Sequence, residues 1–349
     1  MKWTLRVLLS ISIAGLLLVL LMVWGGVSPR DVFATLRSLP PGVFVLALGL
    51  HVFTYCMRAL RFRVLIPRRF RPGFRRTLTI AAAHNMASYL LPAKTGEASF
   101  VLYMRIHASV PGSVGLAALL VARFLDAAIL CLALSSTCFY LAGEPRFAAL
   151  TWLGTAGGLL VAAAGLFLVL SLRGDLIVRA VQAMLRWIRL HHFRRGEALL
   201  LKANNLVEAL RSERNGRLGL GLLTSVPMWC SVFGFYALLA RAMGMPDWVK
   251  IPEATFGAAL GMLFNLLPVN GAAGMGTQEL GWVAGFHRFL GVDSELALST
   301  GIGVHLVQLF NIVAMGFLAH LAMGAMPRVR DFEEEAQRGV DPDPEPLTD

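Results

Sequence analysis

The chain has 349 residues, of which 56% are hydrophobic and 15% charged, and its formal net charge is +11. Its apolar residues fall in runs of about 20 or more rather than in amphipathic patterns, which excludes a soluble globular protein and indicates an integral membrane protein. The Lys and Arg residues are concentrated beside these runs, so the positive charge predicts membrane lipids as partners and excludes nucleic acid. Because the four cysteines lie inside apolar runs, we expect no disulfide, no metal and no cofactor.

Six apolar runs are long enough to cross about 30 Å of hydrocarbon as α-helices. They lie at residues 5–24, 42–60, 112–141, 149–171, 218–243 and 295–323. The first run is too long for a secretory signal and has no small-residue cleavage site, so we expect it to be a true span. These runs predict an all-α polytopic membrane protein with about six transmembrane helices.

Two further apolar regions are interrupted by Pro or Gly. Each consists of two pieces of about a dozen residues, which reach only about 20 Å as helices. The pieces are residues 78–91 with 97–108, and residues 254–267 with 276–290. Regions 78–108 and 254–290 are therefore predicted to be re-entrant helical hairpins, which are tolerated where protein or a cavity surrounds them.

The basic segments predict the orientation of the chain. Eight arginines and no acidic residue lie between residues 58 and 76, which predicts that this segment and both termini lie in the cytoplasm. Residues 174–212 combine basic residues with apolar residues at helical spacing and predict an amphipathic helix on the cytoplasmic leaflet. Residues 326–349 are acidic and Pro-rich and predict a disordered cytoplasmic tail.

The spans and hairpins divide the membrane region into two halves of opposite topology. Residues 1–145 and 146–325 each contain two spans, a hairpin and a last span. Both hairpins have a Leu-Leu-Pro sequence that is followed by Gly and Glu. The matching segments are Tyr89-Leu-Leu-Pro92 with Gly96 and Glu97, and Asn265-Leu-Leu-Pro268 with Gly276 and Glu279.

The spacing after each of these glutamates is also repeated. The residues 26 and 29 positions later are polar in both halves. They are Arg123 and Asp126 after Glu97, and His305 and Gln308 after Glu279. Broken helices at corresponding positions of an inverted-topology repeat are typical of transporters whose site lies near the bilayer midplane.

Three polar residues of the first hairpin, Asn85, Lys94 and Glu97, lie where little water can solvate them. One interpretation is that they satisfy backbone groups freed at Pro92 and Gly96. The alternative is that Lys94 and the helix start after it bind a lipid phosphate. In that case Glu97 caps the helix or binds a proton or an amine-bearing headgroup.

The second hairpin contains a Gly-rich group of candidate residues. They are Asn265, Pro268, Asn270, Gly271, Gly274, Gly276, Gln278 and Glu279. Glycines there allow left-handed turns and a close approach of the backbone to a ligand, or they pack helices together. No Gly-Lys-Ser/Thr sequence follows them, so direct ATP drive is not indicated.

Two of the spans carry polar stripes. Arg123 and Asp126 are three residues apart on one helical face and can pair locally, and His305, Gln308 and Asn311 form a similar stripe. Such stripes either hold helices together by hydrogen bonds or line a site or pathway.

Two arginines at the predicted cytoplasmic end of the second span, Arg58 and Arg61, are one helical turn apart. They either extend their side chains to the membrane surface or hold the phosphate of an entering lipid.

Taken in order, these residues resemble the lysylphosphatidylglycerol synthase transmembrane-domain, or flippase-like, family of membrane proteins. The resemblance covers roughly residues 1–325 and lies in Arg58-Ala-Leu-Arg61-Phe62, Asn85 with Pro92-Ala-Lys-Thr-Gly96-Glu97, Arg123-Phe-Leu-Asp126, and Pro268 with Ala273-Gly-Met-Gly276-Thr-Gln-Glu279. The chain departs from the family pattern at Lys94, Phe100, Ala122 and Ala273, where an Arg, a basic residue, an acid and a Gly are common. The resemblance implies movement of a lipid between leaflets.

We therefore expect a lipid flippase or transporter, not an enzyme, for an anionic or modified lipid made by a separate enzyme. The resemblance implies an aminoacyl-phospholipid, glycolipid, hopanoid-type or polyprenyl-linked lipid. One alternative is a membrane-embedded enzyme that modifies a headgroup, with Glu97, Asp126 or Glu279 as general base and His305 as acid. Another is a solute permease. The sequence leaves open the lipid, the direction of transport and a homo-oligomeric state.

Overall fold

The computed structural model of the protein describes residues 19, 22–23, 27–91, 96–172, 217–265 and 272–325, without the side chains of residues 146 and 163–172. Across these ranges the chain forms ten α-helices and no strand, which confirms the predicted all-α fold. Short 3-10 segments join some of them: η1 (Arg68–Phe70), η3 (Pro145–Phe147) and η5 (Ala272–Gly274). The predicted amphipathic helix at 174–212, the tail at 326–349 and all but three residues of the span at 5–24 lie outside the described residues.

Four of the described helices are long and apolar enough to cross a membrane, so the chain is a multi-pass membrane protein. They are α3 (Pro41–Leu65), α6 (Gly112–Leu141), α10 (Arg217–Ala242) and α13 (Ser294–Gly324). A fifth helix, α7 (Leu150–Leu172), has 23 residues and matches the span predicted at 149–171. The bounds agree with the predicted spans to within a residue or two, except that α3 ends at Leu65 rather than at residue 60.

The two ends of α3 are set by prolines. Pro41 occupies the first helical position, where its missing N–H has no helical acceptor to satisfy. Ile66 precedes Pro67 and is extended, with φ −83° and ψ 132°, as expected for a residue before proline. The helix runs five residues past the predicted end of the span, and Arg61 lies in this part with a fully buried side chain.

Two pairs of helices are too short to cross the hydrocarbon. The first pair is α4 (Phe74–Leu90) and α5 (Ala98–Ala108), and the second is α11 (Ile251–Asn265) and α12 (Thr277–Val283). A π-helical turn, η6 (Ala284–Phe289), continues α12. α4 and α11 begin four and three residues before the predicted pieces, and the other bounds agree with the prediction to within two residues.

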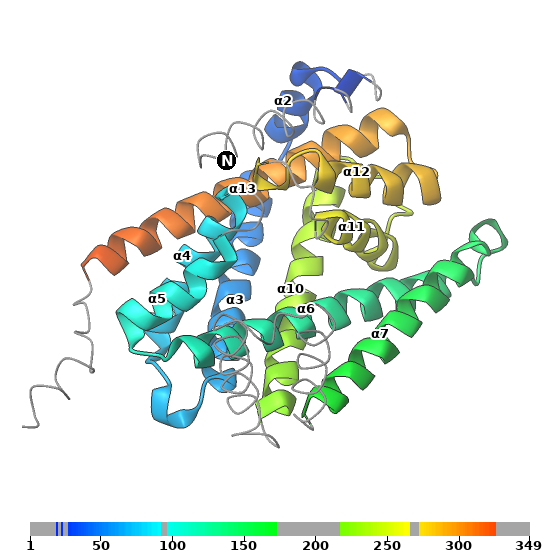
Figure 1. Ribbon diagram of the computed structural model, residues 1–349. Coiled ribbons are helices and arrows are strands. Elements are labelled where there is room, and N and C mark those ends of the chain that lie inside the picture. The colour runs from blue at the N-terminus through cyan, green and yellow to red at the C-terminus, as the bar shows by residue number, and fades with distance from the viewer. Residues whose placement is uncertain are drawn as a thin grey trace, which may run out of the picture.

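The first helix of each short pair packs against the last long helix of the other half. α4 packs against α13, α11 packs against α6, and α3 and α10 pack along each other. Within each half the two short helices contact each other, and the second contacts the next long helix. Figure 1 shows α13 passing α4 and α12, and α6 lying beside α7. Each short pair is therefore in contact with long helices of both halves.

Glycines bring the two helices of the second short pair into backbone contact. A Cβ atom on Gly285 would lie 2.7 Å from the Cα of Gly257, and one on Gly281 would lie 2.9 Å from the Cα of Gly261. Small residues four positions apart on both helices allow this approach. In the first pair a Cβ on Gly96 would lie 2.1 Å from a backbone carbonyl oxygen of α4, so glycine is required there as well.

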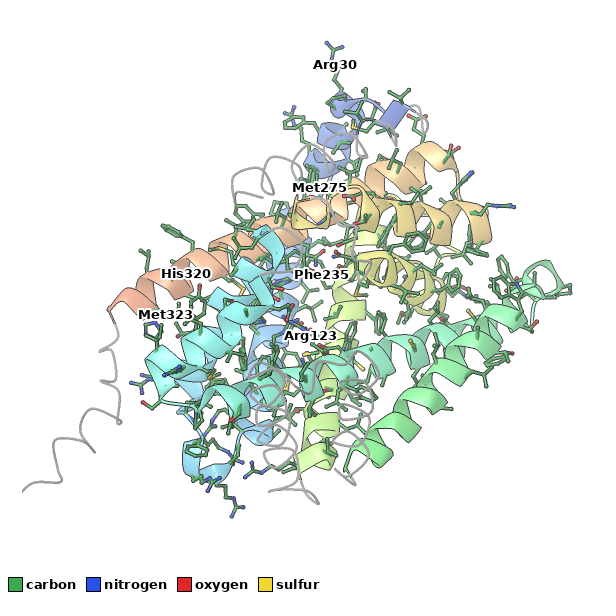
Figure 2. The ribbon with its side chains drawn as sticks, in the orientation of Figure 1. Arg30, Arg123, Phe235, Met275, His320 and Met323 are labelled. Carbon is green, nitrogen blue, oxygen red and sulfur yellow. The ribbon has the colours of Figure 1, made fainter. Side chains whose placement is uncertain are left out.

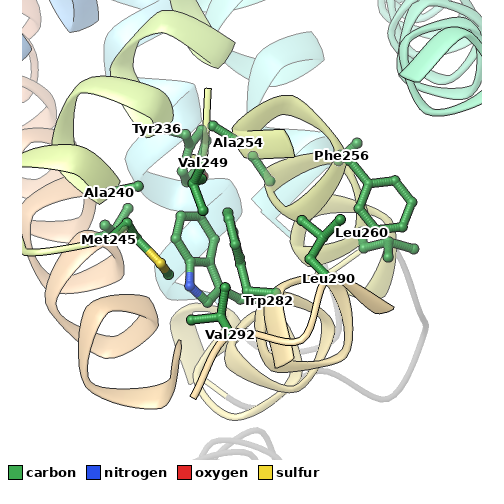
Figure 3. Close-up of a cluster of buried hydrophobic side chains, with 14 of the residues drawn as sticks. Tyr236, Ala240, Met245, Val249, Ala254, Phe256, Leu260, Trp282, Leu290 and Val292 are labelled. Carbon is green, nitrogen blue, oxygen red and sulfur yellow. The ribbon is translucent and has the colours of Figure 1, made fainter. Parts of the chain in front are cut away.

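The largest cluster of buried apolar side chains lies around the second short pair (Figure 3). Its central side chain, Trp282 of α12, has its ring centroid 4.5 Å from that of Phe286 and 5.9 Å from that of Tyr236 of α10. Burying a side chain such as Phe286 contributes roughly 1.5–3 kcal/mol. This packing fixes the first turn of α12, which carries Gln278 and Glu279.

The short helix α2 (Pro29–Arg37), which precedes α3 and packs against α13, begins with a capping box. The hydroxyl and the backbone amide of Ser28 donate to Asp31 Oδ2 at 2.6 and 2.7 Å. These hydrogen bonds lower the pKa of Asp31 from its ordinary value because they stabilise the ionised carboxylate.

Candidate functional site

Charged side chains of α3, α5 and α6 meet between the helices. α3 supplies Arg58 and Arg61, and α6 supplies Arg123 and Asp126. Glu97 occupies the position just before α5. We call these five residues the arginine cluster; Figure 2 shows Arg123 lying among the helices.

Glu97 and Arg123 form an ion pair with two hydrogen bonds. Arg123 donates from Nε to Oε2 and from Nη2 to Oε1 of Glu97, each at 2.9 Å. Ser88 of α4 donates its hydroxyl to Oε1 at 2.6 Å. The suggestion that Glu97 caps α5 is wrong, because its side chain makes no capping hydrogen bond and both oxygens are bound elsewhere. The side chains of Arg123 and Glu97 are 35% and 29% exposed, so a ligand can reach this pair.

Asp126 joins the two halves of the chain. It accepts from Arg61 Nη1 at 2.5 Å and Nη2 at 3.2 Å, and from Trp229 Nε1 of α10 at 3.0 Å. The predicted local pair with Arg123 is confirmed, with Nη1 of that residue 3.1 Å from Oδ2. Arg61 also donates to the Ser225 hydroxyl at 3.3 Å and has no exposed side-chain surface. The suggestion that Arg61 extends to the membrane surface is therefore wrong, because a buried carboxylate neutralises it.

Among the residues that the structure describes, Arg58 has no carboxylate partner. Its Nη1 donates to Asn85 Oδ1 of α4, and the Asn85 amide donates to the Tyr55 hydroxyl at 2.8 Å. The guanidinium lies 5.8 Å from the Tyr55 ring centroid, within the range of a cation–π interaction. Its Nε is buried and has no hydrogen-bond partner among the described residues. The arginine cluster therefore contains three guanidinium groups and two carboxylates, and its net charge is +1.

His84 belongs to the surroundings of this cluster and was not among the predicted residues. It is fully buried, with Nδ1 3.1 Å from the Ser99 hydroxyl and Nε2 3.4 Å from Arg123 Nη2. A single histidine in an apolar segment gives no sequence signal, because it is commonly a core residue. Its position directly before Asn85 was the one available indication.

The second half holds a group of side chains that we call the glutamate–histidine cluster: Gln278 and Glu279 of α12, and His305 and Gln308 of α13. His305 Nδ1 lies 2.6 Å from Glu279 Oε1, and neither side chain is exposed. The backbone amide of Gly276 donates to the other oxygen, Oε2, at 2.7 Å. The two residues 26 positions apart are therefore in direct contact, as they are in the first half.

A chain of hydrogen bonds links this cluster to the first short pair. Gln278 Nε2 donates to Gln308 Oε1 at 3.0 Å, and the Tyr236 hydroxyl donates to the same oxygen at 2.8 Å. Gln308 Nε2 donates in turn to the hydroxyl of Tyr89, on α4, at 2.8 Å. Tyr236 and Tyr89 were not among the predicted site residues, because their contacts depend on how helices far apart in the sequence pack against each other.

The remaining predicted residues are distributed around the two clusters or fall outside the structure. Asn265 donates to Gln278 Oε1 at 3.2 Å. Gly274 and Gly276 have φ of 78° and 85°, which confirms the left-handed turn that glycine allows before α12. Pro92, Lys94, Pro268, Asn270 and Gly271 lie outside the described residues.

Asn311 ends the polar stripe of α13. It is fully buried, and neither its Oδ1 nor its Nδ2 has a hydrogen-bond partner among the described residues. An unsatisfied buried amide costs about 1–3 kcal/mol per polar group, so this position favours a polar ligand.

Comparison with known proteins gives one result. The family model described as "Lysylphosphatidylglycerol synthase TM region" matches residues 5–316. This range includes both clusters and all described helices except the end of α13. No curated protein gives a match to the chain.

Proposed function

Since the chain belongs to the lysylphosphatidylglycerol synthase TM region family, we propose that it is a lipid transporter of the bacterial cytoplasmic membrane. It moves a phosphate-bearing lipid, anionic or with a modified headgroup, between the two leaflets. A separate enzyme makes this lipid. The matched family region is the membrane region of the synthase, and we assign this chain no enzymatic step.

The charge balance of the arginine cluster carries this proposal. Asp126 and Glu97 neutralise Arg61 and Arg123, whereas within the described part of the chain Arg58 contacts neutral groups, Asn85 and Tyr55. An unmatched charge among apolar helices is costly, and a phosphodiester carries the single negative charge that would match it. Guanidinium groups bind phosphate oxygens through short, charge-assisted hydrogen bonds. The partly exposed Arg123 and Glu97 lie beside this position and would meet the rest of the headgroup.

We place the arginine cluster in the first of two inverted repeats, residues 1–145 and 146–325, each with a re-entrant hairpin. The contacts of α4 with α13 and of α11 with α6 support this arrangement, because equivalent helices of the two halves make equivalent contacts. The hairpins then enter from opposite sides of the membrane. The positive-inside rule puts both termini in the cytoplasm.

The headgroup would move along polar side chains while the lipid tails stay in the bilayer. The Tyr89–Gln308 hydrogen bond, at 2.8 Å, connects the surroundings of the arginine cluster with the glutamate–histidine cluster. One turn further along α13, the unpartnered amide of Asn311 offers another polar contact. These groups extend the polar route from one half of the chain to the other.

Reconstitution tests this proposal with vesicles that contain a headgroup-labelled phospholipid and an impermeant quencher. Arg58→Gln removes the unmatched charge and with it the charged hydrogen bond to the lipid phosphate. Because a hydrogen bond to a charged group contributes about 1.5–3 kcal/mol, transport should slow about tenfold to a hundredfold. Arg75→Gln, at an exposed arginine of α4, is the matched control and should transport at the wild-type rate. Glu97→Gln breaks the pair with Arg123 and should also slow transport while the protein still folds.

Three outcomes separate this function from the alternatives. The proposal is wrong if wild-type vesicles expose aminoacyl-phospholipid, glycolipid and polyprenyl-linked lipid no faster than empty vesicles. If mass spectrometry shows that cells without the gene lack a lipid species, the protein would be a headgroup-modifying enzyme. The complete burial of Glu279 and His305 argues against these two residues as the base and acid of such an enzyme. Uptake of a water-soluble compound without lipid movement would indicate a solute permease.

A further inference from the structure

The contact between Glu279 and His305 contains a shared proton. The Nε2 atom of His305 lies 3.1 Å from the carbonyl oxygen of Ala273, which can only accept a hydrogen bond, so Nε2 carries a hydrogen. Nδ1 lies 2.6 Å from Glu279 Oε1, a distance at which two lone pairs would repel each other. A second hydrogen must therefore lie between Nδ1 and Oε1.

The remaining carboxylate oxygen fixes the proton count. Glu279 Oε2 accepts from the backbone amide of Gly276 at 2.7 Å, so it needs no hydrogen of its own. The pair is neutral overall, whether the shared proton resides on the imidazole or on the carboxyl group. If that proton leaves, the neutral imidazole keeps one ring hydrogen, so a ring lone pair faces either the Glu279 carboxylate or the carbonyl oxygen of Ala273. One negative charge then remains where neither side chain is exposed. The contact can then persist only at a large cost in free energy.

We infer that the Glu279–His305 pair is a proton-binding site that holds the start of α12 against α13 and releases it when the proton leaves. Its use in energy coupling rests on the proposed lipid transport: binding and release of one proton would accompany movement of the second short pair. The corresponding contact of the first half, between Glu97 and Arg123, involves a guanidinium and has no such dependence.

Within the described part of the chain, the groups around the pair do not supply an alternative counter-charge. The titratable residues of the neighbouring elements include Tyr236 of α10, Tyr89 of α4, Glu253 of α11, His287 of η6 and Asp31 of α2. The two tyrosines reach the cluster through Gln278 and Gln308, whereas Glu253, His287 and Asp31 bond to backbone groups or side chains of their own segments. Among the described residues, Glu279 and His305 have no ion-pair partner other than each other.

Glu279→Gln tests the inference without requiring transport. The Gln amide can donate to Nδ1 while its carbonyl accepts from Gly276, so all hydrogen bonds are kept without a titrating proton. Between the ordinary pKa of histidine, about 6.5, and the pH at which the shared proton leaves the folded protein, the wild-type unfolding constant should rise by up to about tenfold per pH unit relative to the variant. Purified protein in detergent, melted at a series of pH values, gives this difference. Glu253→Gln, which neutralises another buried carboxyl group, should keep the wild-type pH dependence.

Two further measurements complete the test. If Glu279→Gln does not fold, His305→Lys replaces the imidazole with a permanent cation and should likewise remove the pH dependence. Parallel melting curves for the wild type and the variant that folds would overturn the inference. In vesicles, an imposed pH difference should change the wild-type rate of lipid movement and leave the variant rate unchanged, and equal responses would also overturn it. If no lipid moves in any vesicle, the transport function fails while the melting curves still decide the proton site.

Discussion

Replacement of Asp126 by Asn tests whether charge holds the arginine cluster together. The Asp126 carboxylate accepts four hydrogen bonds, two from Arg61, one from Arg123 and one from Trp229. Because the Arg61 side chain has no exposed surface, the neutral amide would leave a buried guanidinium without a counter-charge. Removing one partner of a buried ion pair costs about 3–5 kcal/mol, and we expect D126N to lower the free energy of unfolding by this amount.

Unfolding in mixed micelles, followed by loss of helical circular dichroism as denaturing detergent is added, measures this change. Asp247→Asn is the control, because Asp247 and its partner Arg241 are 96% and 66% exposed and such a pair contributes about 0–1 kcal/mol. The double variant R61Q/D126N should be less destabilised than the sum of the single variants by about 0.5–3 kcal/mol, since it leaves no unpaired charge. Equal stability of D126N and D247N, or strictly additive effects in the double variant, would refute this reasoning.

Three other predictions concern packing, the contact between the halves, and pH. Gly281→Ala places a Cβ 2.6 Å from a backbone carbonyl oxygen and should destabilise the chain by about 1–3 kcal/mol in the same assay, whereas Gly49→Ala, with no atom within 4 Å, should not. Tyr89→Phe removes the acceptor of the Gln308 amide and should cost about 1–3 kcal/mol, with a loss of transport in vesicles. Because the pKa of Asp31 is lowered, its capping hydrogen bonds stabilise α2 above the ordinary pKa and are lost as the pH falls through the lowered value. The hydrogen-exchange protection factors of α2 should therefore fall below about pH 4 in the wild type but not in D31N.

The helices were predictable because their signals are local. Runs of apolar residues set the long helices, and prolines set their ends, as Pro41 and Pro67 do for α3. The placement of Arg61 was less predictable. A guanidinium normally marks the membrane surface, whereas Arg61 lies inside the protein beside a carboxylate 65 residues away.

The sequence indicated which residues form the site, but it did not indicate most of the contacts between them. The Arg123–Asp126 pair follows from helical geometry at a separation of three residues, and the repeated spacing of 26 indicated which residues correspond. The partner of Arg58 lies 27 residues away on another helix, and the partner of Tyr89 lies 219 residues away. Such contacts depend on the rotation and depth of packed helices, which the pattern of a single helix does not determine.

The two halves place different chemistry at corresponding positions. In each, a glutamate at the start of a short helix contacts the residue 26 positions later on the next long helix, Arg123 in the first half and His305 in the second. A guanidinium stays charged under physiological conditions, so the first contact is permanent, whereas the second lasts only while a proton is shared. Alternating access requires that one repeat move against the other. In the proposed transport cycle, the half with the permanent contact and Arg58 would therefore stay fixed, and the half with the proton-dependent contact would release its short helix.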